Sequence, residues 1–371
     1  MKKIIIMLAI CSFFSFISLP KAQAKILGDV NYDSKIDLAE AIYALQILAG
    51  IKNVPSQSEF EGIWDTPSQG RNTSSLKNTR YIFNVTSESK NVDIELIGLG
   101  VDEYLYVIDN FGNTIVSSDN GISSNSLLPG TYTIIPTTYD SGVTGNYTLS
   151  ITGPVADIRT VSSPHITKKD SISVSGGRNH NSPKNVFYSF ELSEKKRVEL
   201  QLQGTGFDEY IYLLDSFNNI ISEADSGYIL YDLDPGQYKI VVTTYSPNIT
   251  GGYILDIWGD ISDLQKFTYP HFETNGSVTS SGGRDPSSTN NPHYNFDVDK
   301  TGYVQIEYQG TGYDNYLYLL DNLNGIISES DSGNFLGILE PGTYTIVAAT
   351  YSSGITGGFT IDIWGSVSNF P

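Results

Sequence analysis

Short hydrophobic segments alternate with polar turn residues along most of the chain. YIFNV, NVDIELIG, EYLYVID, GTYTIIPTTY and GNYTLSITG are rich in β-branched and aromatic residues, and Gly, Asn, Asp, Pro and Ser separate them. Such a density of short strands and turns is typical of β-sandwiches. Outside the N-terminal segment, no stretch has a helical hydrophobic period. The pattern therefore predicts a mainly β protein.

The strand pattern occurs three times with a period of 106 residues. VDEYLYVIDNFGNTI at position 101 recurs as FDEYIYLLDSFNNII at 207 and YDNYLYLLDNLNGII at 313, and the segment that begins PGTYTI at 129 recurs at 235 and 341. The copies fall near 60–154 (module 1), 166–260 (module 2) and 272–366 (module 3), with DIRTVSSPHI and ISDLQKFTYPH as connectors. A copy of this size can build its own two-layer core, so we expect three tandem, jelly-roll-like β-sandwich modules rather than a solenoid.

Residues 1–24 have the pattern of an export signal. Two lysines precede the apolar run from Ile4 to Leu19, and Ala22-Gln23-Ala24 forms a small-residue cleavage site. We expect cleavage after Ala24. The alternative, a membrane anchor, needs about 20 apolar residues, and the run is shorter than that. Since Cys11 is the single cysteine, the mature chain has none.

Acidic residues directly after the cleavage site follow the spacing of an EF-hand calcium loop. Calcium prefers six to eight oxygen ligands, which alternate residues of a tightly curled loop can supply, with a backbone carbonyl at position 7 and a bidentate Glu at position 12. Ser34 stands at position 6, where Gly is usual, and should weaken the site. The predicted ligands are Asp29, Asn31, Asp33, Lys35 through its carbonyl, Asp37 and Glu40.

A helix should follow this loop, because apolar residues from Leu38 onward have helical spacing and Gly50 lies where it would end. With no room for an entering helix before Asp29, residues 25–55 form a calcium loop plus α-helix. The unit resembles one half of a dockerin. That resemblance implies Ca²⁺ binding and a cohesin-like partner, although IKNVPSQSEF is a polar linker where the second dockerin copy would stand. The apolar face of the lone helix therefore needs a cover, either the next module or another chain.

The repeats resemble the bacterial pre-peptidase C-terminal domain, a β-sandwich attached to secreted proteases and other exported proteins. The features that carry this resemblance are an Asp-x-Tyr-x-Tyr-x-x-Asp strand, an Asn-containing turn, Pro-Gly-x-Tyr, and a Thr-Tyr strand that ends in Gly-x-Tyr or Gly-x-Phe. They cover about three quarters of the chain. The resemblance implies a domain that accompanies catalysis without performing it.

Acidic and aromatic residues recur at equivalent places in the modules. The acids could hold calcium between loops, but turn capping by Asp explains their positions better. The tyrosines are two residues apart, so each pair shares one strand face. If that face is exposed to solvent, the aromatic rings could stack on sugar rings or pack against an extended peptide. We favour the alternative, in which the face is core or half-buried. The acids are Asp102, Asp109 and Asp119 in module 1, Asp208, Asp215 and Asp225 in module 2, and Asp314, Asp321 and Asp331 in module 3; the pairs are Tyr104 and Tyr106, Tyr210 and Tyr212, and Tyr316 and Tyr318.

The overall charge excludes some classes of partner. The 371 residues contain 41 Asp and Glu against 22 Lys and Arg, a formal net charge of -19. Nucleic acid and anionic membranes both attract clustered Lys and Arg, so we expect neither as a partner. Catalytic motifs such as a nucleophile elbow or H-E-x-x-H are absent from the sequence, which favours a protein that is not an enzyme.

The sequence thus predicts a bacterial protein that is secreted, extracellular or on the cell surface, with the periplasm as a further option. We expect it to bind calcium and to act as a binding, display or spacer array for an extracellular protein or polysaccharide. One alternative is a dockerin-like component of a scaffolded polysaccharide-degrading complex. Another is an accessory subunit of a secreted hydrolase.

Overall fold

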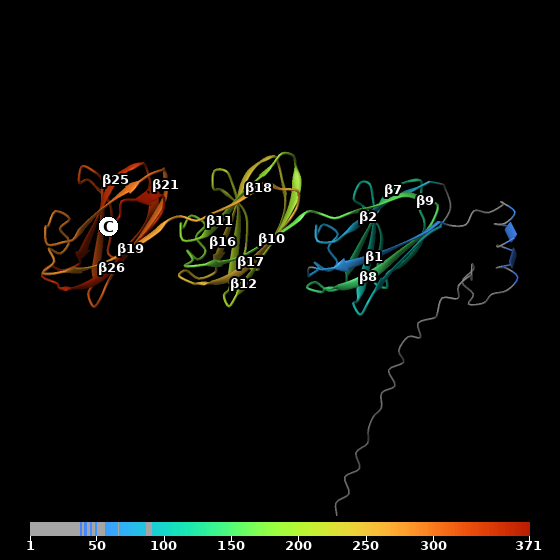
Figure 1. Ribbon diagram of the computed structural model, residues 1–371, viewed down its shortest axis with the longest axis horizontal. Coiled ribbons are helices and arrows are strands. Elements are labelled where there is room, and N and C mark those ends of the chain that lie inside the picture. Colours follow the sequence, from blue (N-terminus) through green and yellow to red (C-terminus); the bar gives the residue numbers. More distant parts are fainter. Residues whose placement is uncertain are drawn as a thin grey trace, which may run out of the picture.

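The computed structural model describes residues 56–65, 67–86 and 91–371, together with Leu38, Ala41, Ile42, Leu45, Gln46 and Ala49. From Ser56 onward the described residues form a row of three similar β-sandwiches along the longest axis of the molecule (Figure 1). The expected mainly β fold with tandem sandwiches is confirmed. The described residues between Leu38 and Gln46 are helical, as expected. Within the described part of the chain, no helix has the length and apolar character that crossing a bilayer requires.

Each module consists of nine strands. Module 1 contains β1 (Ser56–Trp64), β2 (Arg80–Val85), β3 (Asn91–Gly98), β4 (Glu103–Asp109), β5 (Thr114–Ser118), β6 (Ile122–Ser126), β7 (Gly130–Thr138), β8 (Gly145–Gly153) and β9 (Val155–Val161). Module 2 contains β10 (His165–Ile172), β11 (Val186–Leu192), β12 (Lys196–Thr205), β13 (Glu209–Asp215), β14 (Ile220–Ala224), β15 (Tyr228–Leu233), β16 (Gly236–Thr244), β17 (Gly251–Trp258) and β18 (Ser262–Phe267). Module 3 contains β19 (His271–Val278), β20 (His293–Val298), β21 (Gly302–Gly310), β22 (Asn315–Leu320), β23 (Ile326–Ser330), β24 (Asn334–Leu339), β25 (Gly342–Thr350), β26 (Gly357–Trp364) and β27 (Val367–Ser368).

The three modules share one antiparallel topology. In module 1 a four-stranded sheet has the order β1-β8-β3-β6 and a five-stranded sheet the order β5-β4-β7-β2-β9. The corresponding orders are β10-β17-β12-β15 and β14-β13-β16-β11-β18 in module 2, and β19-β26-β21-β24 and β23-β22-β25-β20-β27 in module 3. Apart from the β4–β5 hairpin and its counterparts, the chain changes sheet at each step, so both layers must form together.

Strands extend into the segments expected to be connectors. β9 and β18 each add an edge to the five-stranded sheet of their module, which leaves only residues 162–164 and 268–270 between modules. Both links end in proline, and the carbonyls of Pro164 and Pro270 accept hydrogen bonds from Gly259 and Gly365 of the following module. Because these links have three residues each and are hydrogen-bonded to the following module, they restrict the movement of one module relative to the next.

Alternate residues of each strand fill the space between the two sheets. In β3 the buried residues are Val92, Ile94 and Leu96, and in β4 they are Leu105 and Val107. Their neighbours along these strands point to the outer faces, as a side-chain period of two requires. The core of each module therefore has apolar side chains from both sheets.

The repeated Pro-Gly-x-Tyr sequence closes a corner of the sandwich. The hydroxyl of Tyr238 donates to the carbonyl oxygen of Asp234 at 2.7 Å, and Tyr132 and Tyr344 make the same bond in the other modules. The bond ties the start of the strand to the turn before it. The recurrence of this tyrosine thus has a local structural cause.

We predict that Tyr238→Phe lowers the free energy of unfolding of module 2 by about 1 kcal/mol, because one hydrogen bond is lost while the ring stays in place. Hydrogen exchange of the β16 amides in the full chain measures this change module by module. Tyr231→Phe is the control, since the Tyr231 side chain is exposed. Equal protection in the two variants would contradict the structural role of the corner.

Candidate functional site: the junctions between modules

The predicted calcium ligands lie outside the described residues. Asp29, Asn31, Asp33, Lys35, Asp37 and Glu40 therefore remain a prediction from their spacing. Across the ranges that the structure describes, no three His, Cys, Asp or Glu side chains converge as they would around a metal ion.

The aspartates that end the central strands cap their own turns. In module 1 the Asp109 carboxylate accepts hydrogen bonds from the backbone NH groups of Phe111 and Asn113, both at 2.9 Å. The Asn113 side chain also donates to Asp109 and, with these NH groups, lowers the pKa of the carboxyl. Asp215 and Asp321 accept equivalent backbone bonds in modules 2 and 3. These contacts support turn capping over a calcium site.

A docking segment between the first and second strands covers the paired tyrosines of each module. We use this name for residues 67–79, 173–185 and 279–292. Buried Ser–Thr hydrogen bonds hold these segments to the five-stranded sheets, between Ser68 and Thr138, Ser175 and Thr244, and Ser281 and Thr350. The tyrosines lie on the outer face of the sheet but are buried or half-buried beneath the segment. The preferred interpretation, core or half-buried packing, is therefore confirmed.

Each docking segment also carries an arginine that stacks on a tyrosine of its own module. The guanidinium carbons of Arg71, Arg178 and Arg284 lie 4.1 to 4.2 Å from the ring centroids of Tyr139, Tyr245 and Tyr351. In modules 1 and 3, a hydroxyl of the tyrosine pair donates to the backbone carbonyl of this arginine. The recurring Gly-Arg therefore attaches each docking segment to the five-stranded sheet of its own module.

The docking segment of module 1 binds the four-stranded sheet of module 2. The Ser75 hydroxyl lies 3.1 and 3.0 Å from the two carboxylate oxygens of Glu199, and the backbone NH of Leu76 donates to the same carboxylate at 2.6 Å. Lys77 donates to Gln201, and its ammonium lies 4.6 Å from the ring centroid of Trp258. Burial lowers the pKa of Lys77, while the nearby carboxylates Glu199 and Asp256 oppose that shift.

The docking segment of module 2 repeats this arrangement on module 3. Ser182 donates to Gln305 at 2.6 Å, and the buried ammonium of Lys184 donates to Glu307 and to Asn248 of its own module. The Lys184 nitrogen lies 4.3 Å from the ring centroid of Trp364. A cation over an aromatic face gains electrostatic attraction, and the gain is larger away from water. Both junctions thus use a serine, a lysine and a tryptophan.

The carboxylate and the amide exchange places between the junctions. Along the receiving strand the order is Glu199 then Gln201 in module 2, but Gln305 then Glu307 in module 3. The carboxylate therefore faces the serine and a backbone NH at the first junction, and the lysine at the second. Glu199 is fully buried and Glu307 is partly buried, and at each junction donors compensate the carboxylate.

The three tryptophans of the chain lie in two kinds of environment. Trp64 is part of a core cluster, whereas Trp258 and Trp364 are buried on the outer face of the sheet, at the junctions. His165 and His271 stack on them with ring centroids 4.4 Å apart, and each bonds an aspartate, Asp256 or Asp362. The two histidines are one 106-residue period apart. That recurrence, with the Lys and Trp of neighbouring copies, was the sequence signal for the junctions.

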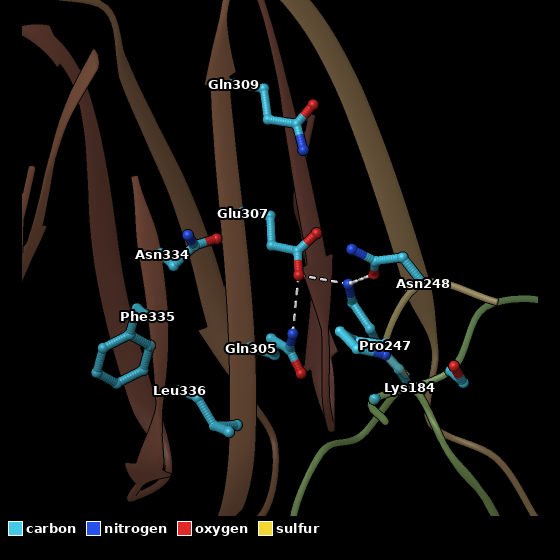
Figure 2. A pocket seen from close by; sticks show the side chains of 11 residues that line it. Lys184, Pro247, Asn248, Gln305, Glu307, Gln309, Asn334, Phe335 and Leu336 are labelled. Carbon is cyan, nitrogen blue, oxygen red and sulfur yellow. Dashed lines mark hydrogen bonds and ion pairs between the residues drawn. The ribbon is translucent and has the colours of Figure 1, made fainter. Parts of the chain in front are cut away.

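A groove of about 340 Å³ lies beside the second junction (Figure 2). Gln305, Glu307 and Gln309 point toward it from one face of β21, and Asn248 lines it from module 2 (Figure 2). Asn334 of β24 pairs with Glu307 across the sheet. At the first junction, the equivalent of Asn334 is Tyr228, whose ring centroid lies 5.7 Å from the Lys77 ammonium. The second junction is therefore open where the first holds an aromatic ring.

The two outer modules each lack one residue of the lysine–tryptophan contact at the end of the row. Asn290 of module 3 stands where modules 1 and 2 have Lys77 and Lys184, and Thr152 of module 1 stands where modules 2 and 3 have tryptophan. A further module could not form the same lysine–tryptophan contact at either end.

Comparisons with known proteins leave the family open. Neither a protein-family model nor a curated protein matches the chain. A chain from the X-ray structure of the entire lipid-containing bacteriophage PM2 aligns with 11% identity over 84% of this chain and 99% of its own, with a TM-score of 0.18. The Bacillus anthracis TIE protein aligns with 9% identity over 87% of this chain and 76% of its own, with a TM-score of 0.11. Similarity this low carries no argument about fold or function.

We predict that Lys184→Met loosens the junction between modules 2 and 3, because Glu307 keeps its charge and loses its cationic partner. Removing one partner of a fully buried pair costs about 3 kcal/mol, and we expect a smaller cost here because the Glu307 side chain is 14% exposed and keeps its bond from Gln305. Distances between spin labels on modules 2 and 3 should change from one narrow distribution to a broad one. Lys169→Met, at an exposed lysine of module 2, is the control. A narrow distribution in both variants would show that Lys184 does not hold the junction.

Proposed function

We propose that this protein is an exported, non-enzymatic binding and display array. Residues 25–55 form a calcium-binding unit, and the three sandwiches form a stiff row that holds ligand sites at fixed spacing. The observation that carries the proposal is the repeated junction, because a spacer or display protein needs modules whose relative orientation is set. Residues 162–164 and 268–270 leave little free chain at these junctions. The row resembles pre-peptidase C-terminal domains in its repeated motifs, which supports a secreted, extracellular or cell-surface location.

A neutral polysaccharide is the ligand that the groove at the second junction favours. Amide side chains both donate and accept hydrogen bonds, as the hydroxyl groups of a sugar do. Gln309, Asn334 and Asn248 offer such groups around Glu307, and Leu336 adds an apolar contact. The volume of about 340 Å³ is within the usual range of small-molecule sites.

We predict that Asn334→Tyr abolishes binding of neutral oligosaccharides while the junction stays intact, because tyrosine is the residue that module 2 has at this position. The probes are cellohexaose, xylohexaose and laminarihexaose, measured by titration calorimetry against the mature protein. Asn275→Tyr, on the edge strand β19, is the control. If none of the three probes binds the unsubstituted protein, or if Asn334→Tyr binds equally well, the groove is not a site for these sugars.

For the N-terminal unit, we predict that Glu40→Gln weakens calcium binding at least about tenfold, because a neutral amide replaces the bidentate ligand. Calorimetric titration of the mature protein with CaCl₂ measures the affinity. Glu59→Gln, at an exposed acid of β1, is the control. Unchanged affinity in Glu40→Gln would refute the EF-hand assignment.

Two other functions make different predictions for the same protein. A dockerin-like role requires a cohesin-like partner that is captured in calcium and lost in Asp29→Ala. A role as an accessory subunit of a secreted hydrolase requires that the array raise the activity of a co-secreted enzyme. Turnover of peptides or polysaccharides by the purified protein, removed by one point substitution, would overturn the non-enzymatic proposal.

A further inference from the structure

The outer face of the four-stranded sheet is the receiving face of each junction. In modules 2 and 3 the preceding docking segment contacts this face at Glu199 and Gln201, or at Gln305 and Glu307. Module 1 has the same sheet in the same strand order. Its equivalent face has Asp93 and Glu95 at these positions, and residues 1–55 contain no further copy of the repeat.

Module 1 has large apolar side chains on this face where the other modules have polar ones. They are between 46% and 63% exposed, and we call them the head face: Ile63, Ile97, Leu99 and Ile122. The equivalent residues are Ser171, Gln203, Thr205 and Tyr228 in module 2, and Ser277, Gln309, Thr311 and Asn334 in module 3. At these four positions the large aliphatic residues belong to module 1 alone, whereas on β24 of module 3 Leu336 and Ile338 stand where module 1 has Ser124 and Ser126.

Strand register places the head-face residues on one side of the sheet. Ile97 pairs with Thr148, and Ile122 pairs with Glu95. Ile63 pairs with Asn146, whose carbonyl accepts a hydrogen bond from the backbone NH of Leu99. The patch thus crosses the whole sheet from β1 to β6. Exposed apolar area of this extent usually marks a contact surface.

The N-terminal helical residues present a matching stripe. Leu38, Ile42 and Leu45 share one helix face, because residues four and three apart lie above one another. These side chains are between 46% and 72% exposed. From Leu38 to Leu45 a helix advances about 10 Å, and the head face from Glu95 to Leu99 extends about 13 Å along its strand. The two apolar surfaces therefore agree in length.

The chain connects the two surfaces directly. The seven steps from Ala49 to Ser56 span at most about 25 Å, and β1 begins at Ser56 on the edge of the sheet that carries the head face. A second copy of the protein fits this face less well. Its free docking segment has Asn290 in place of the lysine, and Thr152 stands here in place of the tryptophan.

We propose that the helix that contains Leu38, Ile42 and Leu45 packs on the head face of module 1. It covers this sheet as the docking segments cover the sheets of modules 2 and 3, and it gives the apolar side of the lone helix its cover. This packing would fix the position of the N-terminal unit relative to module 1. This packing uses the helix alone and does not depend on calcium binding or on the groove at the second junction.

The test measures the distance between spin labels in the full mature chain. Labels at Gln46→Cys on the helix and Asp119→Cys beside β6 can be placed without interference, since Cys11 is removed with the export signal. The expected result is one narrow, short distance. Introducing Ile97→Gln and Ile122→Asn, the residues that module 3 carries, should broaden that distribution. Ile326→Gln, at an exposed position of module 3, should leave it unchanged.

Two outcomes would overturn the proposal. One is a broad distribution in the chain with an intact head face, which shows that the helix does not pack there. The other is sedimentation that depends on protein concentration and loses this dependence with Ile97→Gln, which shows that a second copy covers the face. A narrow distance that survives removal of calcium by a chelator supports the packing independently of the calcium site.

Discussion

At each junction a lysine lies in the contact between two modules, half-buried in the case of Lys77 and buried in the case of Lys184. An ammonium group loses its hydration when it is buried, and it stays charged only where acceptors and aromatic faces replace the water. Lys77 obtains this environment from Gln201 and Trp258, and Lys184 from Glu307, Asn248 and Trp364. These partners surround the lysine only at one orientation of the neighbouring modules. Desolvation therefore makes the junction selective for geometry, even where its net contribution to stability is small.

The docking segment couples the inside of one module to the surface of the next. One side of it covers the tyrosine pair of its own sheet and is held by the Ser–Thr bond and the stacked arginine. The other side presents the serine and lysine to the following module. Because both sides belong to one short segment, the lysine is positioned by packing within its own module. Contacts within one module therefore help to place the side chains that bind the next module.

Much of the fold follows from local sequence patterns. The period-two burial of Val92, Ile94 and Leu96 in β3 is visible in the sequence, and so is the threefold repeat. The side of the tyrosine pairs was harder to assign, because apolar residues occupy both faces of β13 and β22. The strands β9 and β18 were expected to be connectors, because their sequences have weak hydrophobic alternation and their pairing partners are far away in the chain.

The junctions could not be derived from any one copy, since each forms between residues of different copies. Lys77 and Trp258 look like an ordinary surface lysine and a core tryptophan when each is considered alone. Their counterparts Lys184 and Trp364 recur one repeat later, together with His165 and His271, and the comparison of copies is the only sequence signal. The candidate calcium loop from Asp29 to Glu40 rests on a contiguous spacing instead, so sequence alone could propose it.

The distribution of lysine and tryptophan also makes the order of the modules meaningful. The lysine of the docking segment is present in modules 1 and 2, as Lys77 and Lys184. The tryptophan that receives it is present in modules 2 and 3. Of the possible arrangements of three different modules, only the existing one brings a lysine to a tryptophan at both junctions. Recombination that shuffles the modules would break a junction. Duplication of the middle module would add a Lys184–Trp258 pair, so the row can grow in length only from its centre.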